Sequence, residues 1–199
     1  MHRKKTGAAW VGETFVREFW QLVKLNVLFL LCCLPVVTFG VARAAMARCT
    51  VNMARDVPND VWTDFLAALR QDTVRNLLCG LAELALLWMG VMLVTADGFF
   101  PALLGMLLLC VTAAFFQNFW AVQAAVDIPF AAAAKNAWLL CLLRPGMTVL
   151  GLGVNALLLI PAVLFFPLSL PYVLLFPCGL SGFASGMIGW SSCKRYLIR

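Results

Sequence analysis

The stretch that decides the fold is residues 99–126, which reads FFPALLGMLLLCVTAAFFQNFWAVQAAV and contains no charged side chain. A helix of roughly 20 apolar residues spans the hydrocarbon core of a bilayer, and this stretch exceeds that length. Residues 77–96, 146–166 and 168–190 are similarly apolar, and among them only the first stretch carries a charge, Glu83. These stretches predict an all-α, polytopic membrane protein with four spans.

The composition of the 199-residue chain agrees with this prediction, since 63% of the residues are hydrophobic and only 12% are charged. Soluble domains are about half apolar and about a quarter charged, so a water-exposed fold could not bury this many apolar side chains. The composition therefore excludes a soluble enzyme, a disordered chain and a nucleic-acid-binding protein. The excess of 15 Lys and Arg over 9 Asp and Glu indicates contact with anionic lipid, and we expect the bilayer as a partner.

The basic residues predict how the spans are oriented. All 15 lie within residues 1–24, 43–75, 135–144 or 194–199, whereas the connectors at 97–98 and 167–171 contain none. The positive-inside rule places the basic segments in the cytoplasm and makes the two bare connectors external turns. We therefore expect one integral membrane domain over residues 1–199, with a cytoplasmic C-terminus.

The remaining apolar segment, LNVLFLLCCLPVVTFGVA at residues 25–42, allows two interpretations. It is long enough to cross once as a fifth span with a proline kink, although basic residues flank both of its ends. Alternatively, Pro35 and Gly40 break the helix, because proline lacks a backbone donor and glycine tolerates bends. The chain would then return over residues 25–55 as a hairpin, giving six membrane segments and two cytoplasmic termini. We favour the hairpin.

Two short amphipathic helices are expected on the cytoplasmic side, at residues 61–75 and 130–143. Trp62, Phe65 and Leu69 recur at helical spacing in the first, and the second carries Trp138. Such helices lie at the membrane interface or dock against a partner helix. These four side chains are therefore the candidate partner-docking residues, with anchoring in the lipid interface as the alternative.

Polar residues inside the predicted spans are the candidate binding residues, namely Glu83, Gln117, Asn118 and Asn155. A carboxylate is costly in hydrocarbon unless it is protonated or paired, so Glu83 is either functional or structural, and in the second case it is neutral or in reach of a basic side chain such as Arg75. Buried amides either line a path for a polar solute or form hydrogen bonds between helices.

The chain has no pattern typical of catalysis or metal binding. Its eight cysteines are scattered without a CxxC motif, and the only histidine is His2, so we expect no metal and no cofactor. It also lacks a nucleophile with a base, a carboxylate pair and a phosphate-binding loop, so we do not expect an enzyme. Gly182 and Gly186 form a GxxxG pattern that favours close helix packing, within the subunit or between copies in a homo-oligomer.

Residues 25–40 resemble the signature of the YesL-like family of small bacterial membrane proteins. That signature is an Asn followed by an apolar run ending in Leu-Pro-(Val/Ile)-Val-Thr-(Ile/Phe)-Gly, and Asn26, Pro35, Thr38 and Gly40 match it. The resemblance continues at residues 44–55, 62–70, 127–136 and 191–199. We expect Pro35 and Gly40 to shape a break in the helix, and Asn26 and Thr38 to bind the backbone groups that the break frees.

The resemblance implies a multi-pass protein of the bacterial plasma membrane in a family whose biochemical activity is unassigned. Members are typically encoded beside carbohydrate ABC importers. This implies an accessory role in carbohydrate uptake, in association with the permease subunits of a sugar ABC importer or in their regulation. The alternative is an autonomous, dimeric channel or facilitator for small solutes, with the buried polar side chains along its path.

Overall fold

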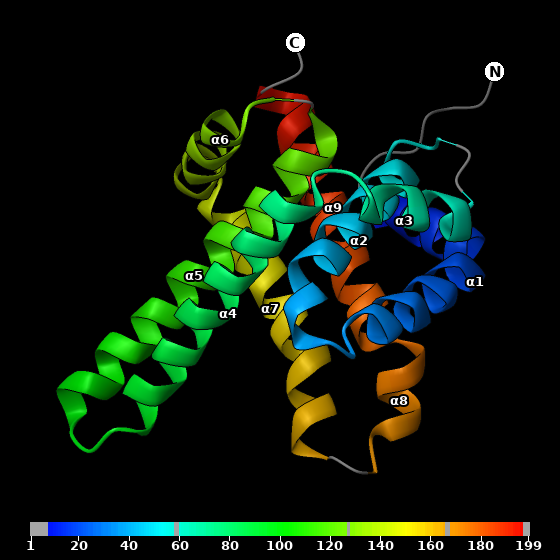
Figure 1. The fold of residues 1–199 in the computed structure, drawn as a ribbon. Helices are drawn as coiled ribbons and strands as arrows, with labels where there is room; N and C mark the ends of the chain where they lie inside the picture. Colours follow the sequence, from blue (N-terminus) through cyan, green and yellow to red (C-terminus); the bar gives the residue numbers. More distant parts are fainter. Residues whose placement is uncertain (1–7, 58–59, 127, 166–167, 197–199) are drawn as a thin grey trace.

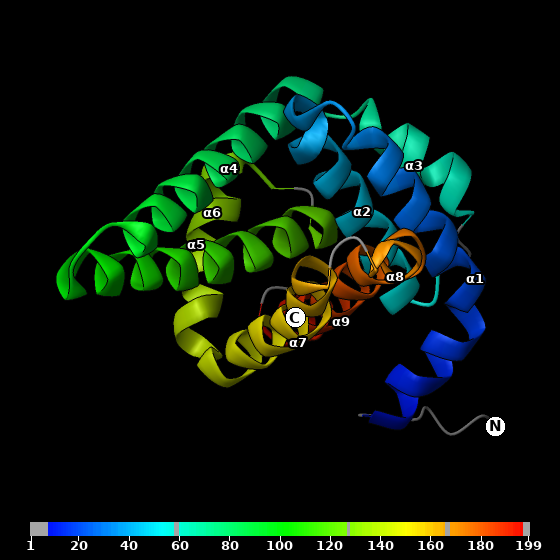
Figure 2. The ribbon, with the colours of Figure 1, turned by 90° about the horizontal axis from the view of Figure 1, so that it is seen from below.

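The computed structural model describes residues 8–57, 60–126, 128–165 and 168–196, and these ranges contain helices and no strand (Figures 1 and 2). Three of the described helices are long and apolar enough to cross a bilayer, which confirms the expected all-α membrane protein. In chain order, the helices are α1 (Ala8–Cys32), a 3₁₀ turn η1 (Val36–Thr38), α2 (Phe39–Ala54), α3 (Val61–Leu69), α4 (Thr73–Thr95), α5 (Phe99–Ala125), α6 (Phe130–Leu143), α7 (Pro145–Leu164), α8 (Leu170–Leu175) and α9 (Pro177–Tyr196).

Helices α4 and α5 form a long apolar hairpin that projects away from the other helices (Figure 1). Gly98 closes its turn with a φ of 113°, a conformation that residues with a side chain rarely adopt. Within the hairpin, Gly90 and Gly105 let the helices approach closely, because a Cβ on Gly105 would lie 2.7 Å from the Gly90 carbonyl. The outer faces expose large apolar side chains such as Trp88 and Leu107, as expected for a surface that faces lipid.

The expected fourth span, residues 168–190, is wrong as a single helix. The chain forms α8, breaks at Phe176 and continues as α9 from Pro177. Proline cannot donate the hydrogen bond that would continue α8, and its ring disfavours helical geometry at Phe176, whose φ and ψ are −131° and −48°. The spans identified among the described residues are therefore α4, α5 and residues Pro145–Ala162 of α7.

The apolar segment 25–42 is broken, as the hairpin interpretation predicted. Helix α1 ends at Cys32, and α2 begins at Phe39 after the turn η1. The Thr38 hydroxyl donates to the freed carbonyl of Cys32 and, at 2.7 Å, to that of Pro35. In Figure 1 the turn between α1 and α2 lies well above the α4–α5 turn. The segment thus enters the bundle and folds back instead of forming one continuous helix.

Helix α2 lies at the centre of the fold, with eleven of its sixteen residues buried. It crosses α4 where two glycines meet. A Cβ on Gly40 would lie 2.6 Å from the Cα of Gly80 and closer still to the Asn76 carbonyl oxygen. The glycine of the family signature therefore permits backbone contact between α2 and α4, and a side chain at either glycine would force the helices apart.

Both segments expected to be amphipathic are helical, but the first helix is shorter than predicted, and the second, α6, is apolar rather than amphipathic, since Trp138, Leu139 and Leu142 are exposed. Helix α3 ends at Leu69, and Asp72, at a φ of 52°, precedes the start of α4 at Thr73. Helices α3 and α6 lie at the end of the molecule where α9 also ends, and the α4–α5 turn lies at the opposite end (Figure 1). This arrangement fits the predicted separation of basic segments from bare turns. The assignment of either end to the cytoplasm remains a prediction.

Candidate functional site

The buried carboxylate of Glu83 lies between α2, α4 and α5, and both of its oxygens have a partner. Oε1 is 3.4 Å from Nη2 of Arg43, and Trp120 donates its indole Nε1–H to Oε2 at 2.8 Å. Only 3% of Glu83 is exposed, so these two partners offset the desolvation of the charge. Glu83 is thus paired with a basic residue, as one of the two predictions had it, although Arg75 is engaged with Asp72 instead.

A second polar group joins α5, α7 and α9 around the side chain of Asn155. Its Nδ2 donates to Oε1 of Gln117 at 3.0 Å and to the Ser185 hydroxyl at 3.2 Å. Its Oδ1 accepts a hydrogen bond from the Ser181 hydroxyl at 2.8 Å. The Nε2 of Gln117 is buried without a hydrogen-bond partner among the described residues. The arrangement is the kind of interhelical amide network that holds membrane helices together.

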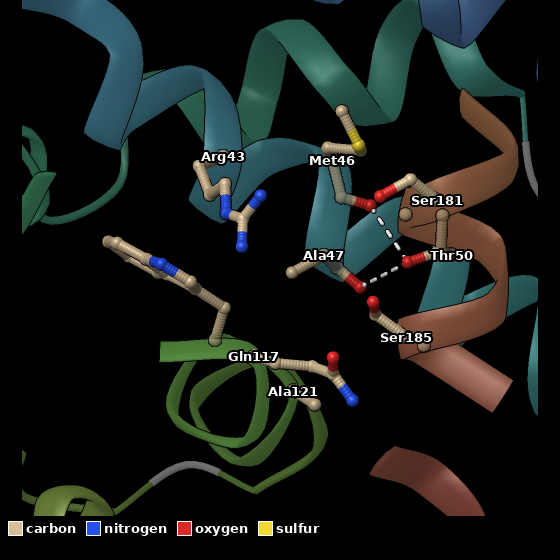
Figure 3. A pocket seen from close by; sticks show the side chains of 11 residues that line it. Arg43, Met46, Ala47, Thr50, Gln117, Ala121, Ser181 and Ser185 are labelled. Carbon is tan, nitrogen blue, oxygen red and sulfur yellow. Dashed lines mark hydrogen bonds between the residues drawn. The ribbon is translucent and has the colours of Figure 1, made fainter. Parts of the chain in front are cut away.

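A cavity of about 30 Å³ lies between these two polar groups. Figure 3 shows Arg43 on one side of it and Ser181 and Ser185 on the other. One water molecule needs roughly 10–15 Å³ measured in this way, so the cavity has room for about two waters. It cannot hold a sugar, because pockets that bind small molecules measure about 300–1,000 Å³.

Of the four candidate binding residues, Gln117 lines this cavity, Glu83 and Asn155 belong to the polar groups on either side of it, and Asn118 lies elsewhere. Asn118 donates from Nδ2 to the Ala114 carbonyl at 3.0 Å and to the Thr148 hydroxyl at 3.2 Å, and it contacts Cys141. These bonds connect α5 to α6 and α7. Asn118 thus lies in a separate contact between helices, away from Glu83.

Asn26 of the signature binds backbone groups at the α8–α9 break, which the sequence did not lead us to expect. Its Nδ2 donates to the Val173 carbonyl at 2.9 Å, and its Oδ1 accepts from the Gly179 N–H at 2.8 Å. In a continuous helix the Val173 carbonyl would accept from residue 177, but Pro177 has no N–H. Asn26 is fully buried and supplies the missing partner at the end of α8 and at the start of α9.

The candidate docking residues are divided between the surface and the core. Trp62 is 57% exposed, but Phe65 is fully buried and Leu69 packs against the core. Helix α3 has apolar residues on both its inward and its outward face. Val61, Phe65 and Ala68 are buried, whereas Trp62 and Leu66 are exposed. Phe65 is therefore corrected from a docking residue to a core residue.

Trp138 on α6 is about half exposed. Its ring also lies 5.3 Å from that of Phe115 on α5. One edge of this tryptophan is thus fixed within the protein, and only the other edge could meet a partner or lipid.

The GxxxG residues Gly182 and Gly186 face α2 within the same chain. A Cβ on Gly186 would lie 2.6 Å from Oγ1 of Thr50, and one on Gly182 would collide with the Met46 side chain. The small-residue stripe of α9 is therefore occupied by an intramolecular helix contact.

Sequence reasoning did not select Arg43, Trp120, Ser181 or Ser185, which complete the two polar groups. Arg43 lies at the edge of an apolar segment, where it counted only as a flanking charge. The sequence did indicate that a buried Glu83 needs a cationic partner. It did not indicate which of several arginines fills that role. Serines and tryptophans are common in membrane helices, and they gave no signal.

Comparison with known proteins bears on the first half of the chain. Residues 22–95 match the family model "Protein of unknown function, DUF624". DUF624 is the family of the YesL-like membrane proteins, so the match extends the resemblance at Asn26–Gly40 through α2, α3 and α4. The matched segment contains Gly40, Arg43 and Glu83. No curated protein and no solved structure matches the chain.

Proposed function

We propose that the protein is an accessory subunit for carbohydrate uptake in the bacterial plasma membrane, where it associates with the permease subunits of a sugar ABC importer. The observation that carries this proposal is that the buried polar residues bond to one another and to neighbouring helices. Glu83, Gln117 and Asn155 form hydrogen bonds and an ion pair between helices, and the cavity beside Gln117 measures only about 30 Å³. Partners within the protein support a structural role for these side chains over a role in binding a solute.

These bonds between buried polar residues favour a role in association over a role in conduction. A polar path through a bilayer needs side chains that can exchange their partners for the solute, and the oxygens of Glu83 and Asn155 already have partners within the protein. A path that uses Glu83 would have to break the Arg43–Glu83 pair, which is costly in a buried site. The alternative function, an autonomous facilitator, therefore requires a different conformation from this one.

The surface proposed for association is the exposed apolar face of α3, formed by Trp62 and Leu66. Trp62 is 57% exposed and Leu66 is 41% exposed. The opposite face of α3 is anchored by the fully buried Val61 and Phe65. This anchoring fixes the two exposed side chains before a partner binds, which lowers the entropic cost of association. Exposed tryptophans are also frequent hot spots of protein interfaces.

Affinity purification from the native host in mild detergent tests the proposal, with partners identified by mass spectrometry. We expect an ABC permease in a fixed ratio to the protein. The double variant Trp62→Ala/Leu66→Ala is expected to lose it, because both exposed side chains are removed without touching the core. The control is Trp88→Ala, which removes a similarly exposed tryptophan from α4.

Two results would contradict the proposal. One is recovery of the protein alone as a homo-oligomer, with no permease in the wild type. The other is sugar or ion flux in vesicles that contain only this protein, particularly if Glu83→Gln abolishes that flux. Either result would favour the autonomous facilitator.

A further inference from the structure

We propose that helix α6 lies inside one leaflet of the bilayer, with its outer face among the phospholipid acyl chains. Helix α6 has 14 residues, fewer than the roughly 20 that a crossing needs. It connects two candidate spans, because it follows α5 and is followed at once by α7. It therefore lies at the membrane surface where α5 ends and α7 begins. This contact with lipid is independent of the proposed association with a permease.

Two contacts show where α6 lies along the length of α5. Near the start of α6, the Phe130 ring lies 5.4 Å from the Phe119 ring, and near its end the Cys141 thiol donates to the Ala114 carbonyl at 3.4 Å. With a rise of about 1.5 Å per residue, these two positions on α5 lie about 9 and 16 Å from its end at Ala125. Helix α6 is therefore beside the last part of α5 and not beyond it (Figure 1).

The length of α5 places these contacts within the hydrocarbon region. Its 27 residues measure about 40 Å, which is about 10 Å more than the hydrocarbon core, so about 5 Å of α5 extends beyond the core at each end. The start of α6 then lies about 4 Å inside the hydrocarbon boundary, and its end lies about 11 Å inside. Helices embedded in a membrane interface bury their apolar face to about 5–10 Å, so the depth of α6 agrees with this arrangement.

The outer face of α6 has the side chains that acyl chains favour. Its large exposed apolar residues are Phe130, Trp138, Leu139, Leu142 and Leu143. The same surface continues onto α7, where Val149 and Leu150 are exposed in a candidate span. Arg144, between the two helices, points inward, because its Nη1 donates to the Ser192 hydroxyl at 3.3 Å. The surface of α7 that faces lipid thus extends onto α6.

Charge distinguishes α6 from α3. Lys135 is the one charged residue of α6 and is exposed, and the nearest acidic residue in the sequence, Asp127, precedes the helix. A lysine can extend its apolar stem along acyl chains and place its ammonium group among the headgroup phosphates. Helix α3 instead begins with two carboxylates, Asp60 at its N-cap and Asp64 in its first turn, which are costly to place in hydrocarbon. Lipid is therefore the occupant that fits α6.

Depth-dependent fluorescence quenching of the full chain in phospholipid vesicles tests the proposal. A fluorescent amino acid replaces Leu142 in one sample, and Leu66 on α3 or Trp88 on α4 in the controls. The vesicle lipids carry a nitroxide quencher either near the headgroup or near the end of the acyl chain. We expect the shallow quencher to act on position 142 at least about twofold more strongly than the deep one, because α6 lies in the outer part of a leaflet. Position 66 should be quenched by neither, and position 88, inside a span, more strongly by the deep quencher.

A second labelled site on the same face, Leu139, guards against a local effect of replacing Leu142 and is expected to give the same pattern. Quenching at positions 142 and 139 that is as weak as at position 66 would overturn the proposal, because α6 would then lie outside the lipid. A preference of both positions for the deep quencher would also overturn it, because α6 would then lie in the bilayer centre.

Photo-cross-linking in native membranes separates lipid from a protein partner. A photoreactive amino acid in place of Leu142 is expected to form adducts with phospholipid, and an adduct with another protein chain would overturn the proposal. Failure here leaves the proposed function intact, since association with a permease is assigned to Trp62 and Leu66 on α3. Loss of that association would in turn leave the lipid adducts at position 142 unchanged.

Discussion

Replacing Asn26 by alanine tests why a polar side chain is fully buried in an apolar helix. The change removes the donor to the Val173 carbonyl and the acceptor from the Gly179 N–H, at 2.9 and 2.8 Å. Both backbone groups then lie in an apolar environment without a partner. The α8–α9 break is expected to become unstable, because Pro177 prevents the helix from satisfying the carbonyl itself.

The size of the effect follows from the two backbone groups that lose their partner. An unsatisfied buried polar group costs about 1–3 kcal/mol, whereas measured side-chain hydrogen bonds in membranes average about 0.6 kcal/mol. Because the Val173 carbonyl and the Gly179 N–H are backbone groups that cannot move to new partners, the higher range applies. We expect Asn26→Ala to lower the free energy of unfolding by about 2–4 kcal/mol.

The decisive comparison is the same change in a Pro177→Ala background, where residue 177 regains an N–H that reaches the Val173 carbonyl. There Asn26→Ala is expected to cost about 1–2 kcal/mol less, and the two substitutions are therefore coupled. The free energies are measured by unfolding in mixed micelles with increasing dodecyl sulfate, followed by circular dichroism. Asn136→Ala on α6 is the control, with an expected change below about 0.5 kcal/mol. An equal cost of Asn26→Ala in both backgrounds would refute this explanation.

Three further substitutions test other parts of the structure, each by the same unfolding measurement. Gly40→Ala should prevent stable folding, because its Cβ would collide with the α4 backbone. The control Gly153→Ala, whose Cβ would have nothing within 4 Å, should be neutral or stabilising by up to about 1 kcal/mol. Similar effects of the two substitutions would contradict the close crossing of α2 and α4. Glu83→Gln should lower the free energy of unfolding by about 1–3 kcal/mol, because it leaves Arg43 without its ion pair. Adding Arg43→Gln should recover part of that loss, whereas additive losses would argue against the pair. Asn155→Leu should cost about 1–3 kcal/mol by removing three bonds between helices, and an unchanged midpoint would show that the network is not stabilising.

Much of the architecture could be predicted because it depends on local properties of the sequence. Helix α5 is an uncharged run longer than a bilayer is thick, and its identity needed no knowledge of its neighbours. The break near Pro35 could likewise be predicted from the residues that form it. The break within residues 168–190 was not predicted, because apolar length was given more weight than Pro177, although the same physical rule applied.

The partners of the polar residues could not be predicted, because they come from distant parts of the chain. Asn26 binds residues about 150 positions away, at a break that was not expected. Glu83 needed a cation, but nothing local distinguished Arg43 from the other arginines. The inward face of α3 was ambiguous for a different reason. Trp62 and Phe65 are both apolar, and periodicity alone did not indicate which would be buried.

Photo-cross-linking in the native host tests the central claim, that this protein works by associating with an importer, most directly. A photoreactive amino acid replaces Trp62 in one strain and Trp88 in another, and the cross-linked products are identified by mass spectrometry. We predict an adduct with an ABC permease subunit from position 62 and none from position 88, which faces away on the α4–α5 hairpin. Adducts only with lipid or with a second copy of the chain from position 62 would contradict the proposed function.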